Sequence, residues 1–511
     1  MSESLPQHSL KYRYLTKLVL TVAGIPLGLV IQAIAPRMLG PGSYGNFSFL
    51  NDSFRQFISF LDCGTSNGFF VSLSKRDSES SLKRFYWGLA LIQTIVLAIL
   101  VWCTFAFGMY SIIWIGQPRI YIVMAAALGV LTWYSQTLMR MADAYGITVK
   151  AEIARLLQKL IGVGLLTVIA MLGLLTLASY FLFGYVMALI LIVGQWAVLR
   201  NHGISIVPSE RLSGQVVRSR GRQFYEFSSP IFLANLTGLI FGFMDRWMLQ
   251  RFGGSVQQGF FGLANQISMV GILFAGALTP LLMREFARSH AKQDLKTMRQ
   301  LFERYVPVLY LVSAYFSIFI AVEADKVTVM FGGQHYGAAR AAVVLMALVP
   351  MHQTYGQLSG SLFLASGRTR VYSAISIVMM FVGLFLSYWL LAPRNYLGLD
   401  LGSEGLAIKT VVMQAIAVNA QLWFNTRMLG MRYKRFLFHQ IGSACILGLL
   451  ALASRWLVDS IAVGTAVRFV GSGVIYTMMC VIAVIVFPKI ALLRRDDFRN
   501  LFRLEKYRSV G

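Results

Sequence analysis

The sequence predicts an all-α integral membrane protein with about fourteen transmembrane helices, arranged as two parallel-repeat lobes of six helices each and a C-terminal helix pair. Its composition, the spacing of its apolar runs and an internal repeat support this prediction. Of the 511 residues, 57% are hydrophobic and only 13% are charged. The mean hydropathy of +0.64 is far above that of an average soluble domain, so no soluble catalytic domain is expected.

Apolar runs of about 20 residues, the length that crosses a bilayer, follow one another along the whole chain. The first six lie near 15–35, 47–73, 85–115, 120–141, 152–176 and 178–199. After a polar connector, eight more lie near 224–248, 257–283, 305–330, 340–366, 371–392, 403–426, 436–458 and 464–488. We therefore predict an N-terminal lobe at 1–220, a C-terminal lobe at 221–430, and an additional helix pair with a basic tail at 431–511.

Lys and Arg are concentrated in every second connector between the predicted helices. The formal net charge is +25, and most of the 46 Lys and Arg residues lie in alternate connectors and at both termini. Basic residues accumulate in loops that stay in the cytoplasm, so both termini are predicted to be cytoplasmic. This distribution argues against nucleic acid as a partner, and the basic tail is expected to lie at anionic lipid headgroups.

Two segments repeat at one constant offset. Arg37-x-x-Gly40-x4-Gly45-x-Phe47-x3-Asn51 matches Arg251-x-x-Gly254-x4-Gly259-x-Phe261-x3-Asn265. Each copy joins the first and second helix of its half. Because six predicted spans separate the copies, both halves enter the membrane in the same direction, and a transporter built from such parallel repeats binds its substrate between them. A duplication kept only for folding is the alternative.

Polar residues in the second predicted span form one narrow stripe. They are spaced by 4, 3, 4, 3 and 4 residues, which places them on one helical face: Ser48, Asp52, Arg55, Ser59, Asp62 and Ser66. An ionisable group near the bilayer centre costs on the order of 2.5–3.5 kcal/mol, so such a stripe must face water or protein. We predict a hydrated, charged cavity between the two halves.

The residues of this cavity are assigned two kinds of role. The predicted substrate-binding residues are Arg55, Asp52, Ser59, Asn235, Asn265, Gln266, Gln353 and Gln357. Asp62, which has no obvious local partner in the sequence, and Asp143 are predicted to couple transport to a proton or another ion. Two alternatives remain open: Asp52 pairs with Arg55 only to allow insertion, and Asp143 pairs with Arg140 at the membrane surface.

Catalytic motifs are absent from the sequence. It has no phosphate-binding loop, no HExxH, no paired-Cys spacing and no nucleophile elbow, and its four cysteines all lie in apolar segments. We therefore expect no enzyme activity, no catalytic residues, no metal and no cofactor.

Four segments resemble one transporter family. They are LGPGSYGNFSFL at 39–50, DRWMLQRFGGSVQQGFFGLANQI at 245–267, LFLASGRTR at 362–370 and LGSEGLAIKT at 401–410. In order and in composition they resemble the Wzx-type polysaccharide-repeat-unit flippases of the multidrug/oligosaccharidyl-lipid/polysaccharide (MOP) exporter superfamily. The resemblance implies a location in the cytoplasmic (inner) membrane, alternating access, and an undecaprenyl-diphosphate-linked oligosaccharide as cargo, for synthesis of O-antigen, capsule or exopolysaccharide. It implies a polysaccharide polymerase and a chain-length regulator as partners.

The resemblance gives Arg55 a role, because the planar guanidinium matches the oxygens of a diphosphate. Two other function classes compete with this one. A multidrug or organic-cation exporter of the same superfamily would share the lobes but would bind cations, which Arg55 disfavours. A membrane glycan polymerase or ligase would need a large outer loop with catalytic residues, and the predicted outer connectors are short.

Overall fold

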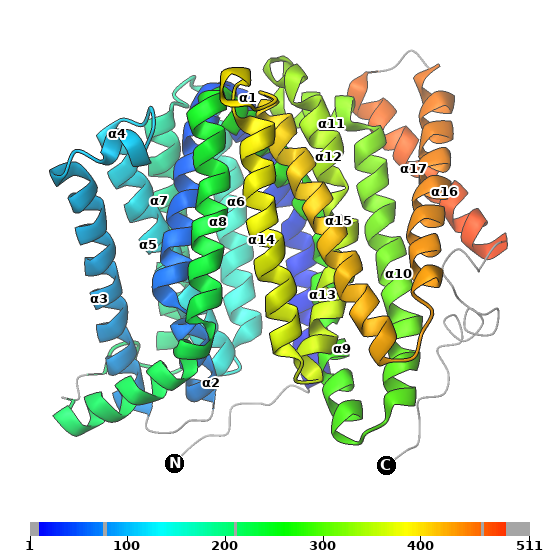
Figure 1. Cartoon of the computed structure of the whole chain (residues 1–511). Coiled ribbons are helices and arrows are strands. Elements are labelled where there is room, and N and C mark those ends of the chain that lie inside the picture. Colours follow the sequence, from blue (N-terminus) through cyan, green and yellow to red (C-terminus); the bar gives the residue numbers. More distant parts are fainter. Residues whose placement is uncertain (1–9, 75–78, 209–211, 461–463, 487–511) are drawn as a thin grey trace. The chain divides into compact units, whose positions relative to one another are not determined.

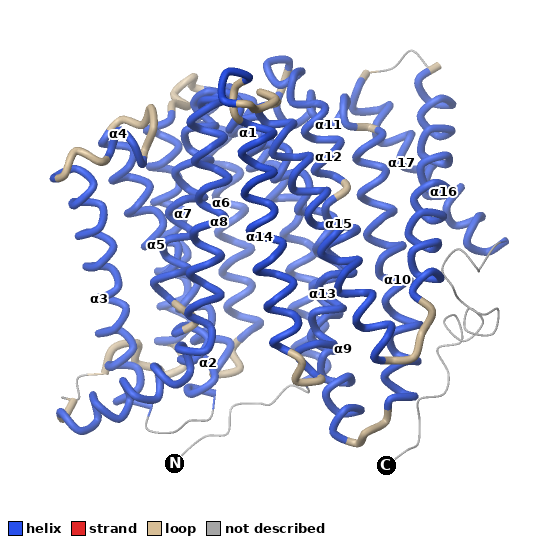
Figure 2. Tube along the Cα trace, viewed as in Figure 1, coloured by secondary structure: helices blue, strands red, loops and turns tan. Residues whose placement is uncertain are grey.

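The computed structural model describes residues 10–74, 79–208, 212–460 and 464–486, and within these ranges every regular element is a helix (Figures 1 and 2). The chain divides into two compact units, Met1–Gly259 and Phe260–Gly511. The predicted lobe boundaries at 220 and 430 stay a prediction.

The helices of the first unit account for the first seven predicted spans. They are α1 (Leu10–Asp62), α2 (Thr65–Ser74), α3 (Glu79–Ala106), α4 (Tyr110–Ile113), α5 (Arg119–Ala144), α6 (Thr148–Met171), α7 (Leu177–Arg200) and the greater part of α8 (Gly214–Ser268). Both α1 and α8 contain two helices joined at a glycine with non-helical backbone angles. Each of these long elements therefore holds one predicted span and the first part of the next.

The second unit continues from α8 with shorter elements. They are η1 (Met269–Ile272), α9 (Leu273–Ala291), α10 (Leu295–Val322), α11 (Ala324–Gly332), η2 (Gln334–Ala339), α12 (Arg340–Ala347), α13 (Val349–Ala365), α14 (Thr369–Leu391), η3 (Arg394–Tyr396), α15 (Gly402–Met428), α16 (Tyr433–Asp459) and α17 (Thr465–Val486). The predicted eighth, ninth and tenth spans are each interrupted, by η1, at Glu323 and at Leu348 respectively.

The all-α membrane fold predicted from the sequence is confirmed. Among the described residues, ten helices are long and apolar enough to cross a membrane. The other four predicted spans coincide with helices that are merged within α1 and α8 or divided between α12 and α13. The expected count of about fourteen is therefore consistent with the structure, while several helix ends lie outside the predicted limits.

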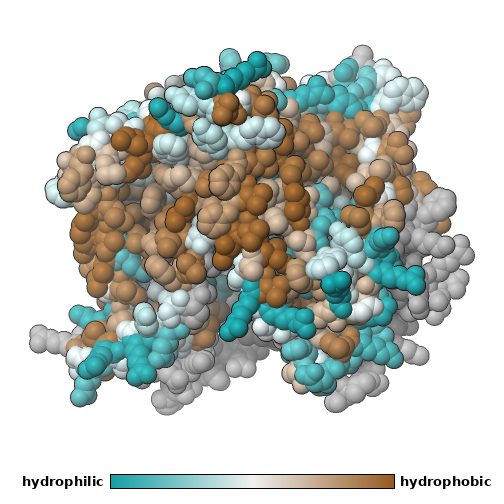
Figure 3. Space-filling view, in the orientation of Figure 1, coloured by the Kyte–Doolittle hydropathy of each residue, from teal (hydrophilic) through white to brown (hydrophobic). Residues whose placement is uncertain are grey.

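The outward surface of the helices is apolar. On α3, Ile92 is 58% exposed and Trp102 is 64% exposed, and large aliphatic side chains are exposed along the same helix. On the face drawn in Figure 3, hydrophobic side chains cover the middle of the helices, and hydrophilic ones gather mainly towards their ends. A soluble protein rarely exposes apolar patches of this extent, whereas lipid tails solvate them.

A core of aromatic side chains supports the second half of α1 in the first unit. Phe49 and Phe54 are almost completely buried, and the ring of Phe54 stacks on that of Trp114 with centroids 4.9 Å apart. Phe57 packs against Phe243 of α8, with centroids 5.4 Å apart. These contacts bury the apolar faces of the helix and hold its polar stripe in one orientation.

Ion pairs connect α16, the first helix of the C-terminal pair, to α11, and α11 to Glu323 at the end of α10. Lys326 forms ion pairs with the fully buried Glu323 and with Asp459, both at 2.7 Å, and Arg455 binds Asp325 at 2.7 Å. Since breaking a buried pair exposes an uncompensated charge, this network fixes α16 against α11.

Candidate functional site

The repeat found in the sequence is a repeated break in the backbone. Gly40 in α1 has φ 70° and ψ 169°, and Gly254 in α8 has φ 71° and ψ −173°. Side chains with a Cβ rarely adopt this conformation, so glycine is required at both positions. At each break one membrane helix ends and the next begins directly after the glycine. The backbone angles of Gly40 therefore set which way the polar stripe of the next helix faces.

The second glycines of the repeat mark a very close contact between α1 and α8. A Cβ on Gly45 would lie 1.7 Å from the carbonyl oxygen of Ser255, and a Cβ on Gly259 would lie 2.1 Å from the carbonyl oxygen of Pro41. Pro41 and Ser255 are themselves equivalent positions of the repeat. The two contacts are therefore the same contact seen from each copy, as in an interface with two-fold symmetry.

A polar cluster holds this crossing together. The side-chain oxygen of Asn46 accepts hydrogen bonds from Ser255 Oγ at 2.5 Å and from Gln117 Nε2 at 2.7 Å. Gln250 Nε2 donates to Ser255 Oγ and to the carbonyl oxygen of Ile115, both at 3.1 Å. Side-chain amides and hydroxyls are the usual links between helices that pack through small residues in membranes.

Below the crossing, Asp52 lies between two arginines. Its Oδ2 binds the guanidinium of Arg246, whose side chain is 8% exposed, and its Oδ1 lies 3.1 Å from Arg55 NH2. Arg246 also donates to Gln258 Oε1 at 3.1 Å, and Gln258 Nε2 donates back to the carbonyl oxygen of Arg246. Arg246 is thus bound on both sides, as a buried charge must be.

Arg55 differs from Arg246 in its exposure. Its side chain is 70% exposed, although Asp52 lies one turn earlier on the same helix. Ser59, one turn later, is exposed as well. The two arginines and the one carboxylate leave one positive charge, and it lies at the accessible end of the cluster. In a membrane protein such a group must meet water or an anion.

We expect Arg246→Met to lower the free energy of unfolding by about 2–4 kcal/mol, because Asp52 loses its buried partner while Arg55 still neutralises part of its charge. Thermal and denaturant unfolding of the purified protein would measure this. Arg251→Met, an exposed arginine of the same helix, is the matched control. A normal stability of Arg246→Met would show that Asp52 does not need this partner.

Asp62 has local partners, contrary to the sequence-based argument. Its Oδ1 accepts hydrogen bonds from Thr65 Oγ1 at 3.0 Å, from the Ser66 amide at 3.0 Å and from Ser66 Oγ at 2.5 Å. The expectation was wrong because it assumed a continuous helix. The helix breaks after Asp62, where Cys63 has φ 43° and Gly64 has φ 78°, and Asp62 caps the first turn of α2.

The remaining predicted residues lie in three places. Asn235 Nδ2 donates to Cys63 Sγ at 3.7 Å, so Asn235 lies beside the break and not beside Arg55. Asp143 is half-buried in the last turn of α5. The other four belong to the second unit: Asn265, Gln266, Gln353 and Gln357. Their part in a common cavity stays a prediction.

Arg246 and Gln258 are not among the site residues predicted from the sequence. Arg246 lies near the end of the predicted span at 224–248, where a charged residue is unremarkable. Arg246 and Asp52 are 194 residues apart in the sequence, so no local spacing pattern predicts that they pair. The repeat is the one sequence feature that points to this pair. Its glycines let the part of α1 that follows Gly40 pack closely against α8, and this packing brings Asp52 towards Arg246.

A family model described as "Polysaccharide biosynthesis protein" matches residues 14–282, more than half of the chain. The chain belongs to the polysaccharide biosynthesis protein family. The matched residues include both copies of the repeat and the whole cluster around Asp52. No curated protein matches its sequence.

Solved structures show which fold this member of the family has. It is similar to a structure described as "Lipid II flippase MurJ, inward closed conformation", with a TM-score of 0.68 and 12% identity over 95% of this chain and 99% of the other. It is also similar to an inward-facing multidrug resistance MATE family transporter of the MOP superfamily, with a TM-score of 0.62 and 14% identity over 83% and 96%. The fold is that of a MurJ- and MATE-like membrane transporter.

Proposed function

We propose that the protein is a flippase that moves an undecaprenyl-diphosphate-linked oligosaccharide across the cytoplasmic membrane, for O-antigen, capsule or exopolysaccharide synthesis. The observation that carries this proposal is the accessible guanidinium of Arg55, which forms an ion pair with Asp52, while Asp52 is in turn bound by the buried Arg246. A bidentate arginine suits a diphosphate, and a site with one excess positive charge selects an anionic headgroup. The family description and the fold of a lipid II flippase agree with this cargo class.

The competing function is export of organic cations, since MATE transporters share the fold. A cation site needs excess negative charge, whereas Asp52 is outnumbered by Arg55 and Arg246. The charge balance therefore favours the lipid-linked sugar. A glycan polymerase or ligase gains no support from a family of this description and a transporter fold.

Reconstitution separates these functions. The purified chain is placed in liposomes that contain a fluorescent undecaprenyl-diphosphate oligosaccharide, and a membrane-impermeant reductant bleaches only the outer leaflet. Cargo that the protein flips becomes accessible, so we expect bleaching well beyond the half seen in protein-free liposomes. Uptake of a fluorescent organic cation is measured in parallel. Cation transport without any gain in lipid bleaching would refute the proposal.

We propose that Asp62 and Asp143 couple this movement to a proton or another cation. We expect Asp62→Asn to slow transport and to remove its response to a pH gradient, because Asn keeps an acceptor for the Ser66 amide but cannot exchange a proton. Ser66→Ala, which removes one hydrogen bond to Asp62 and leaves the carboxylate, is the control. An unchanged response to the gradient in Asp62→Asn would leave only the capping role.

The remaining parts of the proposal concern the cell. Both termini are proposed to be cytoplasmic, and a polysaccharide polymerase and a chain-length regulator are proposed to act on the product at the other side of the cytoplasmic membrane. The proposal needs no catalytic residue, metal or cofactor. Within the described residues, no group of three or more His, Cys, Asp or Glu side chains is placed to hold a metal ion.

A further inference from the structure

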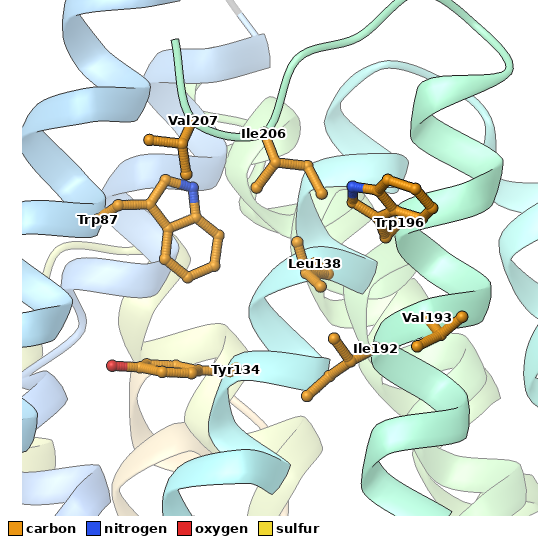
Figure 4. A pocket seen from close by; sticks show the side chains of 8 residues that line it. All are labelled: Trp87, Tyr134, Leu138, Ile192, Val193, Trp196, Ile206 and Val207. Atoms are coloured by element: carbon orange, nitrogen blue, oxygen red, sulfur yellow. The ribbon is translucent and has the colours of Figure 1, made fainter. Parts of the chain in front are cut away.

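A cavity of about 290 Å³ lies in the first unit, away from the cluster around Asp52. Helices α3, α5 and α7 and the connector that follows α7 contribute its apolar and aromatic lining. In Figure 4 the indoles of Trp87 and Trp196 lie on opposite sides of the cavity, and Ile206 and Val207 of the connector close it at the top of the view. The cavity is large enough for part of a small ligand and is lined for an apolar one.

The cavity lies close to one end of the helices. Trp87 is in an early turn of α3, and Trp196 is in the last turns of α7, four residues before Arg200 ends that helix. Tryptophans at this position occupy the boundary between the lipid tails and the headgroups. By the distribution of basic residues this end is the predicted cytoplasmic one, where anionic headgroups attract arginine.

Two arginines flank the opening. The guanidinium of Arg200, an exposed residue, lies over the ring of Trp196 at 4.9 Å from its centroid. On the other side, Arg84 NH1 donates to the carbonyl oxygen of Pro208 at 2.9 Å, directly after the lining residue Val207. The apolar cavity thus ends between two positive charges.

We propose that this cavity binds an acyl chain of an anionic glycerophospholipid of the surrounding membrane. The chain lies against Leu138 and Ile192, and the phosphate lies between Arg84 and Arg200. This arrangement matches the apolar lining to the acyl chain and the two charges to the phosphate of the same lipid. Zwitterionic lipids offer the same chain but no net charge.

Native mass spectrometry of the full chain in detergent tests this proposal. The probes are phosphatidylglycerol, phosphatidylcholine with identical acyl chains, and undecaprenyl phosphate. We expect phosphatidylglycerol to be retained in preference to phosphatidylcholine by roughly fivefold or more, since each basic residue contributes about 1 kcal/mol to binding of an anionic headgroup. Arg200→Ala should reduce this preference by roughly fivefold.

A further variant tests the cavity itself. Ile192→Trp fills the cavity and should abolish the retention of phosphatidylglycerol. Its matched control is Ile99→Trp, at an exposed position of α3. Thermal unfolding checks that each variant is folded.

Three results would overturn the proposal. They are equal retention of the two phospholipids, unchanged retention in folded Ile192→Trp, and displacement of phosphatidylglycerol by undecaprenyl phosphate. The last result would assign the cavity to the tail of the cargo. None of these outcomes depends on transport activity, so the proposed function is tested separately.

Discussion

Arg55→Ala is expected to abolish flipping of the lipid-linked oligosaccharide while the protein remains folded in the membrane. The side chain is 70% exposed and contributes one ion pair, with Asp52 at 3.1 Å, so its loss costs the fold little. The diphosphate, by contrast, loses a charge-assisted bidentate contact. Removing such a partner typically weakens binding by about 2–5 kcal/mol, which corresponds to a reduction in transport of at least about 30-fold.

The bleaching assay in liposomes would measure this loss, and Arg55→Lys is the informative companion. Lysine keeps the charge but offers a single ammonium group, so we expect partial activity. Ser59→Ala, one turn along the same exposed face, should leave transport within a few-fold of the original chain. Normal flipping by Arg55→Ala would show that the diphosphate is bound elsewhere, and equal activity of Arg55→Lys would show that charge alone is required.

The fold was predictable because lipid imposes simple rules. Runs of about 20 apolar residues can cross a bilayer only as helices, so each predicted span coincides with a helix or a broken helix pair. The spacing from Ser48 to Asp62 gave the polar stripe correctly, because it depends only on the pitch of one continuous helix. The same rule failed at the next residue, because the backbone angles of Cys63 and Gly64 end that helix.

The site was less predictable because its pairs are distant in sequence. Asp52 and Arg55 are one turn apart, and their contact follows from helix geometry. The pair of Asp52 with Arg246 depends on the packing of α1 against α8, which no local pattern encodes. Only the repeated glycines carried that information, since Gly45 and Gly259 let the two backbones approach.

Gly45→Ala is expected to cause the largest loss of stability in the first unit. The added Cβ would lie 1.7 Å from the carbonyl oxygen of Ser255, and this obstacle is backbone that cannot rotate away. The helices must separate, which stretches the hydrogen bond of Ser255 to Asn46 and the ion pair below it. We expect the free energy of unfolding to fall by about 3 kcal/mol or more, above the usual range for overpacking.

Thermal unfolding and the yield of monodisperse protein would measure this effect against Gly42→Ala. A Cβ on Gly42 meets nothing within 4 Å, although that glycine lies less than one turn away in the same helix. Gly42→Ala should therefore be neutral or slightly stabilising, because alanine favours the helix by up to about 1 kcal/mol. Equal stability of the two variants would mean that the crossing tolerates a wider separation than the structure shows.

The double variant Gly45→Ala/Gly259→Ala tests whether the two glycines form one contact. If they do, the first substitution already separates the helices, and the second substitution causes little further loss of stability. The combined loss of stability is then well below the sum of the single losses, as for residues that share one interface. Additive losses would mean that each copy of the repeat packs independently. The common origin of the two segments would then explain their sequence but not their contact.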